Sequence, residues 1–211
     1  MIKDKNSIVI LANGEFPSHK VPLTKLKNAR QIICCDGATE KLIKTGMEPT
    51  AIVGDMDSLS SEIQHKYRDI IFKSDCQESN DLTKAFNYAL KLNPLSITIL
   101  GATGMREDHS LGNISLLAHY ASQTDISIEM YTNNGQFKVI FKGGNFPSEP
   151  GKQISLFALD SNIKIKSKGL KYPLDKVIFD SWWKATLNEC EGNSFELALS
   201  TVSPVILFLA Y

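Results

Sequence analysis

The chain has 211 residues, 43% hydrophobic and 22% charged, which is enough for one large domain or two small domains with buried cores. Lysine plus arginine and aspartate plus glutamate both number 23, so the formal net charge is zero. A zero net charge excludes the global basic field typical of nucleic-acid-binding domains, and no apolar run is long enough for a membrane span. We therefore expect neither nucleic acid nor a membrane among the partners.

The first 133 residues alternate between two kinds of pattern. Apolar residues recur at helical spacing within 82–90 and 111–118, and these stretches are separated by short apolar runs typical of buried strands. Strands that alternate with helices predict a Rossmann-like parallel sheet with helices on both faces. The predicted strands are 8–12, 31–35, 51–53, 70–73, 96–100 and 126–131.

The pattern changes at Asn133-Asn134-Gly135, which is a strong turn signal. Short strands punctuated by glycine and proline follow, and no long amphipathic helix is predicted among them. The predicted strands are 137–141, 153–159, 163–167, 196–201 and 205–210. The expected fold class is therefore α/β, with an α/β domain at 1–133 and a small C-terminal antiparallel β-sandwich at 134–211.

The four cysteines, Cys34, Cys35, Cys76 and Cys190, show no C-x-x-C spacing. We expect reduced thiols rather than a zinc site or a disulfide, as in a cytosolic protein. The apolar stretch 8–11 is shorter than the core of a signal peptide. These observations predict a cytoplasmic location.

Aspartates follow the predicted strands repeatedly, or open the helices after them. Because the carboxyl ends of parallel strands share one edge of the sheet, several carboxylates are expected to meet there. Carboxylates in one place repel unless a cation lies among them, and Mg²⁺ prefers such oxygen ligands. The aspartates concerned are Asp36, Asp55, Asp57, Asp75, Asp81 and Asp108.

Each aspartate alone has a structural interpretation, because Asp is common in turns and at helix N-termini. Asp81 in particular could be only a helix N-cap. Asp55 and Asp57 are the stronger pair, because residues two apart in an extended segment face the same way and could reach one ion.

Two loops on the same predicted edge suit phosphate. Residues 101–106, sequence GATGMR, lie between a strand and a helix, where glycine N–H groups and a helix N-terminus favour an anion. Arg106 could stabilise charge in a transition state. Asn13-Gly14-Glu15 forms a second loop, and His109 is either a base or a structural residue.

Several motifs occur in a defined order: LANG at 11–14, CDGA at 35–38, PTAIVGDMDS at 49–58, QESNDLTKA at 77–85 and LGATGMREDH at 100–109. This set resembles the thiamine pyrophosphokinase family, and segments 153–157 and 169–174 extend the resemblance over nearly the whole chain. The resemblance implies an enzyme that transfers diphosphate from ATP to the hydroxyl of thiamine, giving thiamine diphosphate and AMP. It also implies Mg²⁺ as cofactor and a homodimer.

Together, the residue patterns and the resemblance assign four sets of candidate residues. In this hypothesis domain 1–133 binds ATP and Mg²⁺, and domain 134–211 binds thiamine and forms the dimer. The metal ligands would be Asp55, Asp57, Asp81 and Asp108; the catalytic residues Asp81, Lys84, Arg106 and Asp108; the ATP-binding residues Asn13, Asp36, Gly37, Gly101, Gly104 and Arg106; and the thiamine-binding residues Gln77, Trp182, Thr186 and Asn188.

Two choices within these sets stay open. Either Asp81 or Asp108 would accept the proton of the thiamine hydroxyl. Lys84, three residues after Asp81, either contacts phosphate or holds Asp81 in place.

Thiamine needs an apolar slot, which the aspartate edge does not offer. We expect it where the two domains meet, with the β domain supplied by the partner subunit. A tryptophan face suits the cationic thiazolium. Trp182 and Trp183 are adjacent, so in a strand at most one would line the pocket. In the alternative interpretation, one tryptophan is core and the other covers a dimer surface.

Two positions depart from the family pattern. Thr186-Leu187-Asn188 replaces the usual T-S-N element, and Ala102 replaces the second glycine of the usual loop. The departure at Leu187 favours one alternative, a related diphosphokinase for another hydroxymethyl heterocycle such as a pterin. A second alternative is a non-catalytic thiamine or nucleotide sensor on the same fold, although none of the metal aspartates is lost.

Overall fold

The protein is described by a computed structural model that covers residues 6–74 and 78–211. The chain divides into two compact units, Met1–Asn133 and Asn134–Tyr211. No helix within the described ranges is both long and apolar enough to cross a bilayer.

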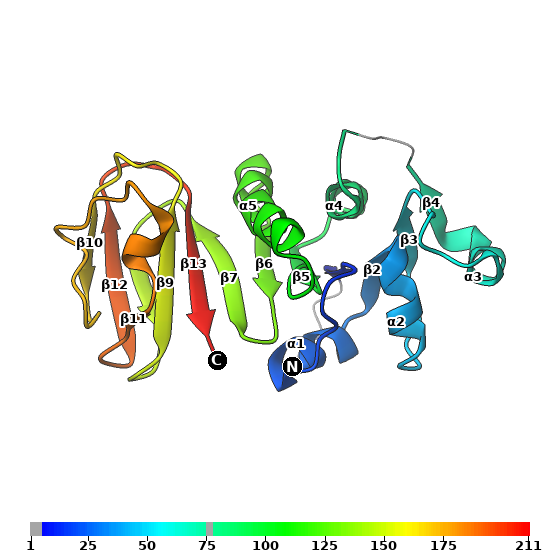
Figure 1. Ribbon diagram of the computed structural model, residues 1–211, viewed down its shortest axis with the longest axis horizontal. Coiled ribbons are helices and arrows are strands. Elements are labelled where there is room, and N and C mark those ends of the chain that lie inside the picture. The colour runs from blue at the N-terminus through cyan, green and yellow to red at the C-terminus, as the bar shows by residue number, and fades with distance from the viewer. Residues whose placement is uncertain (1–5, 75–77) are drawn as a thin grey trace. The chain divides into compact units, whose positions relative to one another are not determined.

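The described part of the first unit is built around a six-stranded parallel sheet (Figure 1). Its strand order is β6-β5-β1-β2-β3-β4, and neighbouring strands run parallel throughout. The strands are β1 (Ser7–Leu11), β2 (Gln31–Cys35), β3 (Ala51–Gly54), β4 (Ile71–Lys73), β5 (Ser96–Leu100) and β6 (Ser127–Tyr131).

Helices cover both faces of this sheet, because side chains at successive strand positions point to opposite sides and both sets are apolar. Val9 packs with Leu26 of α1 and Leu42 of α2 on one face. On the other face lie α4, whose Phe86 is fully buried, and α5 (Figure 1). The helices are α1 (Lys20–Lys27), α2 (Thr39–Ile43), α3 (Ser61–Lys66), α4 (Asp81–Lys91) and α5 (Glu107–Gln123), with short 3₁₀ turns η1 (Asp36–Ala38) and η2 (Arg68–Ile70).

The second unit consists of two antiparallel sheets, ordered β11-β9-β13-β7 and β10-β12-β8. Leu156 and Leu207 from the first sheet share one core with Ile165, Phe195 and Leu197 from the second. The predicted fold class, α/β followed by a small antiparallel β-sandwich, is confirmed. The elements are β7 (Gly135–Ile140), β8 (Gly144–Pro147), β9 (Gln153–Ala158), β10 (Ile165–Lys168), η3 (Trp182–Ala185), β11 (Asn188–Glu189), β12 (Ser194–Leu199) and β13 (Val205–Ala210).

One local expectation about the second unit was wrong. Trp182 and Trp183 lie in the 3₁₀ turn η3 rather than in a strand, so the argument from alternating strand faces does not apply. The turn closes when the Thr186 N–H and hydroxyl both donate to the carbonyl of Trp183. Trp183 is 70% exposed, and Trp182 lies edge-on to Phe157.

The loops after β1 and β5 approach each other so closely that one position excludes any side chain. Gly101 has a φ of 64°, and an added Cβ would lie 2.6 Å from the carbonyl oxygen of Ala12. Backbone hydrogen bonds from Ala12 to Leu100 and from Gly14 to Gly101 hold the two loops together. Gly101 is therefore required both by its left-handed conformation and by the contact.

We predict that Gly101→Ala lowers the free energy of unfolding by more than about 2 kcal/mol. Gly46 is a matched control, because its φ is 80° but nothing lies within 4 Å of an added Cβ. Gly46→Ala should cost only the conformational strain, about 1 kcal/mol. Urea denaturation of both variants measures the difference. Equal costs would contradict the close approach of the two loops.

Candidate functional site

Residues that follow the strands β1, β2 and β5, together with the first turn of α4, line one cavity of about 380 Å³. Asn13 follows β1, Asp36 follows β2, Asp81 opens α4, and Arg106 ends the glycine loop after β5. The structure thus brings together candidates that lie far apart in sequence. The lining residues are Ala12, Asn13, Gly14, Asp36, Ser58, Asn80, Asp81, Ala102, Thr103, Met105, Arg106, His109, Ser110 and Asn113.

Asp36 is the most constrained carboxylate of this edge. It is 3% exposed, and its Oδ1 accepts a 2.5 Å hydrogen bond from the Gly37 N–H. Its Oδ2 is buried and has no hydrogen-bond partner within the described ranges. Burial raises the pKa of Asp36, and the nearby charges of Asp81 and Asp55 add to the effect. A cation near this oxygen would offset both the burial of the negative charge and its repulsion from the neighbouring carboxylates.

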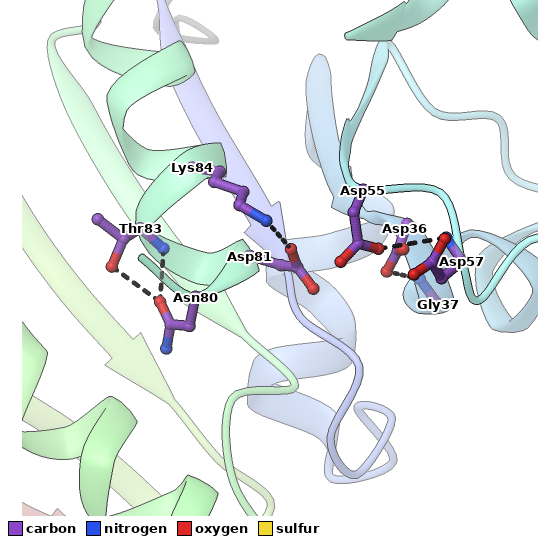
Figure 2. A network of polar contacts seen from close by, with 8 residues as sticks. All are labelled: Asp36, Gly37, Asp55, Asp57, Asn80, Asp81, Thr83 and Lys84. Atoms are coloured by element: carbon purple, nitrogen blue, oxygen red, sulfur yellow. Dashed lines mark hydrogen bonds and ion pairs between the residues drawn. The ribbon is translucent and has the colours of Figure 1, made fainter. Parts of the chain in front are cut away.

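Asp55 and Asp57 lie beside Asp36, as Figure 2 shows, but not in the predicted extended conformation. Met56 between them has a φ of 73°, and Asp55 Oδ1 accepts from the Asp57 N–H at 3.2 Å. This side-chain turn replaces the extended segment because a short carboxylate competes well for nearby N–H groups. The same hydrogen bond is the main cause of a lowered Asp55 pKa.

The sequence left open that Asp81 is only the N-cap of α4, and the structure shows that it is not the cap. Asn80 is the N-cap: its Oδ1 accepts from the N–H of Thr83 at 3.0 Å (Figure 2). The Asp81 carboxylate is therefore not used to cap the helix. Its Oδ1 instead accepts a hydrogen bond from Lys84 Nζ at 3.1 Å. Lys84 is 8% exposed, so this ion pair is largely shielded from water on the lysine side.

Asp108 has a different partner from the other aspartates. It forms a two-pronged ion pair with Arg106, with nitrogen–oxygen distances of 2.6 and 3.1 Å. Hydrogen bonding from Arg106 lowers the pKa of Asp108 to about 2. Within residues 6–74 and 78–211, no three His, Cys, Asp or Glu side chains are arranged to hold a metal ion. The convergence of Asp55, Asp57, Asp81 and Asp108 on one ion therefore stays a prediction.

Some of the backbone N–H groups expected to face phosphate have protein acceptors here. The Gly14 N–H donates to the carbonyl of Gly101 at 2.6 Å, and the Gly104 N–H donates to Ser110 Oγ at 3.2 Å. Gly37 donates to Asp36, as described above. The glycines thus bring the loops together, and direct phosphate contact by Gly37, Gly101 and Gly104 stays a prediction.

Sequence analysis missed Lys41. From α2, its Nζ donates to the carbonyls of Asn13 and Gly14 at 3.2 and 2.9 Å and lies 3.6 Å from Met105 Sδ. Lys41 therefore contacts the loops after β1 and β5 at once, and burial lowers its pKa. No sequence signal distinguishes it from an ordinary helix-surface lysine.

Sequence analysis also missed Asn80 and Asn113. Both line the cavity, and a hydrogen bond of 3.1 Å joins their side chains. The available signal for Asn113 was its helical spacing, four residues after His109, which places both on one face of α5.

The candidate thiamine residues have structural partners. Asn188 is buried, with Oδ1 accepting from the Tyr172 N–H at 3.1 Å and Nδ2 donating to the Tyr172 carbonyl at 2.7 Å. Leu187 is 71% exposed at a φ of 56°, a conformation that is strained for a leucine. Gln77 lies outside the described residues. Thiamine binding by Gln77, Trp182, Thr186 and Asn188 stays a prediction.

Known proteins resemble the chain across both units. Residues 23–130 match the family model described as the thiamin pyrophosphokinase catalytic domain, and residues 135–208 match that of its substrate-binding domain. The chain is 29% identical over 180 residues to thiamine pyrophosphokinase of Bacillus subtilis (strain 168), a match that covers 80% of this chain and 82% of that protein.

Solved structures agree with these sequence matches. The crystal structure of thiamine pyrophosphokinase from Bacillus subtilis superposes with a TM-score of 0.80 at 25% identity, over 97% of this chain and 98% of that one. Thiamin pyrophosphokinase from Candida albicans has a TM-score of 0.79 at 18% identity, over 99% of this chain and 90% of that one. At that identity the second likeness indicates the fold alone.

We predict that Asp36→Asn raises the free energy of unfolding at mildly alkaline pH by about 1 kcal/mol. The folded state raises the pKa of Asp36 above its ordinary value of 3.8, so ionised Asp36 destabilises the fold. This cost is present above the raised pKa and disappears as the pH falls and the carboxyl group is protonated. Urea unfolding at alkaline and acid pH measures the change. If Asp36→Asn were less stable than the unchanged protein at alkaline pH, the claim that ionised Asp36 destabilises the fold would be contradicted.

Proposed function

The chain belongs to the thiamin pyrophosphokinase family of enzymes, and from that premise we propose that it transfers a diphosphoryl group from ATP to the hydroxyl of thiamine. The products are thiamine diphosphate and AMP. The observation that carries the proposal is the cavity at the strand ends, where Asp36, Asp81 and Arg106 gather in the unit that matches the catalytic domain. Carboxylates beside a guanidinium suit a metal–polyphosphate substrate.

The residues present fit Mg²⁺ as the cofactor. The buried Oδ2 of Asp36 has no hydrogen-bond partner within the described ranges, and the carboxylates of Asp55 and Asp81 lie near it. Mg²⁺ needs only one or two carboxylates when water and phosphate oxygens complete its coordination, so three preassembled protein ligands are not required. Bound with ATP, Mg²⁺ would neutralise charge on the phosphates.

The chemical step is a displacement at the β-phosphorus of ATP. The thiamine hydroxyl oxygen bonds to this phosphorus, the bond to the bridging α–β oxygen breaks, and AMP leaves. A carboxylate takes the hydroxyl proton. Asp81 is the better acceptor, because it lines the cavity while both oxygens of Asp108 are held by Arg106.

A homodimer and a cytoplasmic location complete the proposal. The second unit matches the substrate-binding domain of the family, which supports thiamine binding by 134–211. Cys34, Cys35 and Cys190 are free and buried, as expected for reduced thiols, and Cys76 lies outside the described residues. Sedimentation of the purified chain tests the dimer.

A second candidate substrate is a pterin alcohol, and one observation favours it. Leu187 presents an exposed apolar side chain where the family usually carries a serine hydroxyl. A changed side chain at this position would alter selectivity for the ring system while leaving the ATP half of the site intact.

We predict that the purified chain forms AMP from ATP and Mg²⁺ when thiamine is added. The measurement is AMP release with thiamine, with a hydroxymethyl pterin, and with neither. Thiamine-dependent AMP supports the proposal. AMP release only with the pterin would establish the second candidate, and tight thiamine binding without AMP would indicate a sensor.

We predict that Lys84→Met lowers kcat about a hundredfold while the KM for ATP changes less than about threefold. The 3.1 Å contact between Lys84 and Asp81 indicates that the lysine holds the carboxylate. Lys91→Met is the matched control, because Lys91 is exposed in the last turn of the same helix. A large rise in the KM for ATP with unchanged kcat would instead show direct phosphate binding by Lys84.

A further inference from the structure

A chain of side-chain hydrogen bonds crosses the cavity wall from the glycine loop to the start of α4. Asn113 on α5 donates from Nδ2 to the Ala102 carbonyl at 2.8 Å. Its Oδ1 accepts from Asn80 Nδ2 at 3.1 Å. Asn80 Oδ1 in turn accepts from the Thr83 N–H at 3.0 Å. The side-chain amides of Asn113 and Asn80 thereby connect the loop after β5, helix α5 and the start of helix α4.

The donor and acceptor at each step of this series of hydrogen bonds are fixed by the groups at its two ends. The Ala102 carbonyl can only accept, so Asn113 must present its NH₂ group there and its oxygen to Asn80. The Thr83 N–H can only donate, so Asn80 must present its oxygen there and its NH₂ group to Asn113. Each amide therefore has one satisfactory orientation, and the two orientations match.

These hydrogen bonds join the start of α4, which carries the Asp81 carboxylate, to the loop that leads to the Arg106 guanidinium. Asn80 directly precedes Asp81, and its capping hydrogen bond sets the first turn of α4, from which Lys84 also projects. Ala102 lies in the loop that leads to Arg106, and both asparagines line the cavity. The Asn80–Asn113 contact thus connects the helix that carries the acceptor carboxylate to the loop that leads to the arginine, beside the 2.7 Å hydrogen bond between the Thr83 and Tyr120 hydroxyls that also joins α4 to α5.

Neutral amides suit this position. A carboxylate at 113 would be repelled by the Ala102 carbonyl, and a lysine there could not accept the hydrogen bond from Asn80. An amide supplies one donor and one acceptor without changing the charge of the cavity.

We propose that Asn113 is a positioning residue, which holds the start of α4 at a fixed distance from the glycine loop by bridging Asn80 to the Ala102 carbonyl. The proposal rests on the proposed function, because its consequence is correct placement of Asp81 and Arg106 about ATP. Small errors in such placement reduce the rate of the chemical step far more than binding.

The experiment is a double-mutant cycle with Asn113→Ala and Asn80→Ser. The serine hydroxyl still caps α4, so this variant removes the amide bridge and keeps the cap. Each single variant should lower kcat at least about tenfold with the KM for ATP within about threefold, and the double variant should be no worse than either single variant. Asn87→Ala, an exposed asparagine of the same helix, is the control for loss of an amide.

Additive losses in the double variant, or a wild-type kcat in Asn113→Ala, would overturn the proposal. A rise in the KM for ATP with unchanged kcat would also overturn it, because Asn113 would then bind nucleotide directly.

A second readout separates this proposal from the proposed function. Amide hydrogen exchange needs no turnover, so it applies even if the wild-type chain releases no AMP. Asn113→Ala should accelerate exchange at the Thr83 N–H, and Asn80→Ser should accelerate it at the Gly104 N–H in the glycine loop. Faster exchange confined to the substituted element would overturn the bridge, whatever the substrate is.

Discussion

The crowding of carboxylates at one sheet edge is the constraint on which the rest of the site depends. Asp36 is buried with an unpartnered oxygen within the described ranges, and Asp55 and Asp81 are close enough to raise its pKa. Like charges in a partly dry environment destabilise a fold unless something offsets them. Lys84 offsets part of this cost, and in our account a bound Mg²⁺ offsets the rest.

The rest of the first unit holds the carboxylates in place against their mutual repulsion. Strands buried on both faces fix where each carboxylate emerges, and the fully buried Phe86 and Tyr120 stack with their ring centroids 4.0 Å apart to join α4 to α5. Backbone hydrogen bonds hold the loops after β1 and β5 together, and Lys41 contacts both. Such preorganisation is what a phosphoryl-group transfer asks of a protein, because the covalent chemistry is modest.

The strands β1, β2 and β3 of the parallel sheet were predicted well from sequence, because strands buried on both faces are continuous apolar runs. It also placed Asp36, Asp55 and Asp81 on one edge, since topology alone requires this. It missed β8, which has little buried apolar surface, and β11, which is two residues long. It could not see that Asn80 caps α4, that Arg106 pairs with Asp108, or that Lys41 joins two loops. Those partners are set by tertiary contacts rather than by local pattern.

The most direct test of the carboxylate account is the thermal midpoint of unfolding measured against Mg²⁺ concentration at constant ionic strength, without nucleotide. If the crowded carboxylates lack a cation, the midpoint should rise and saturate with Mg²⁺, and Asp36→Asn should weaken the rise. A midpoint that responds to Mg²⁺ no more than to matched sodium chloride would contradict the account.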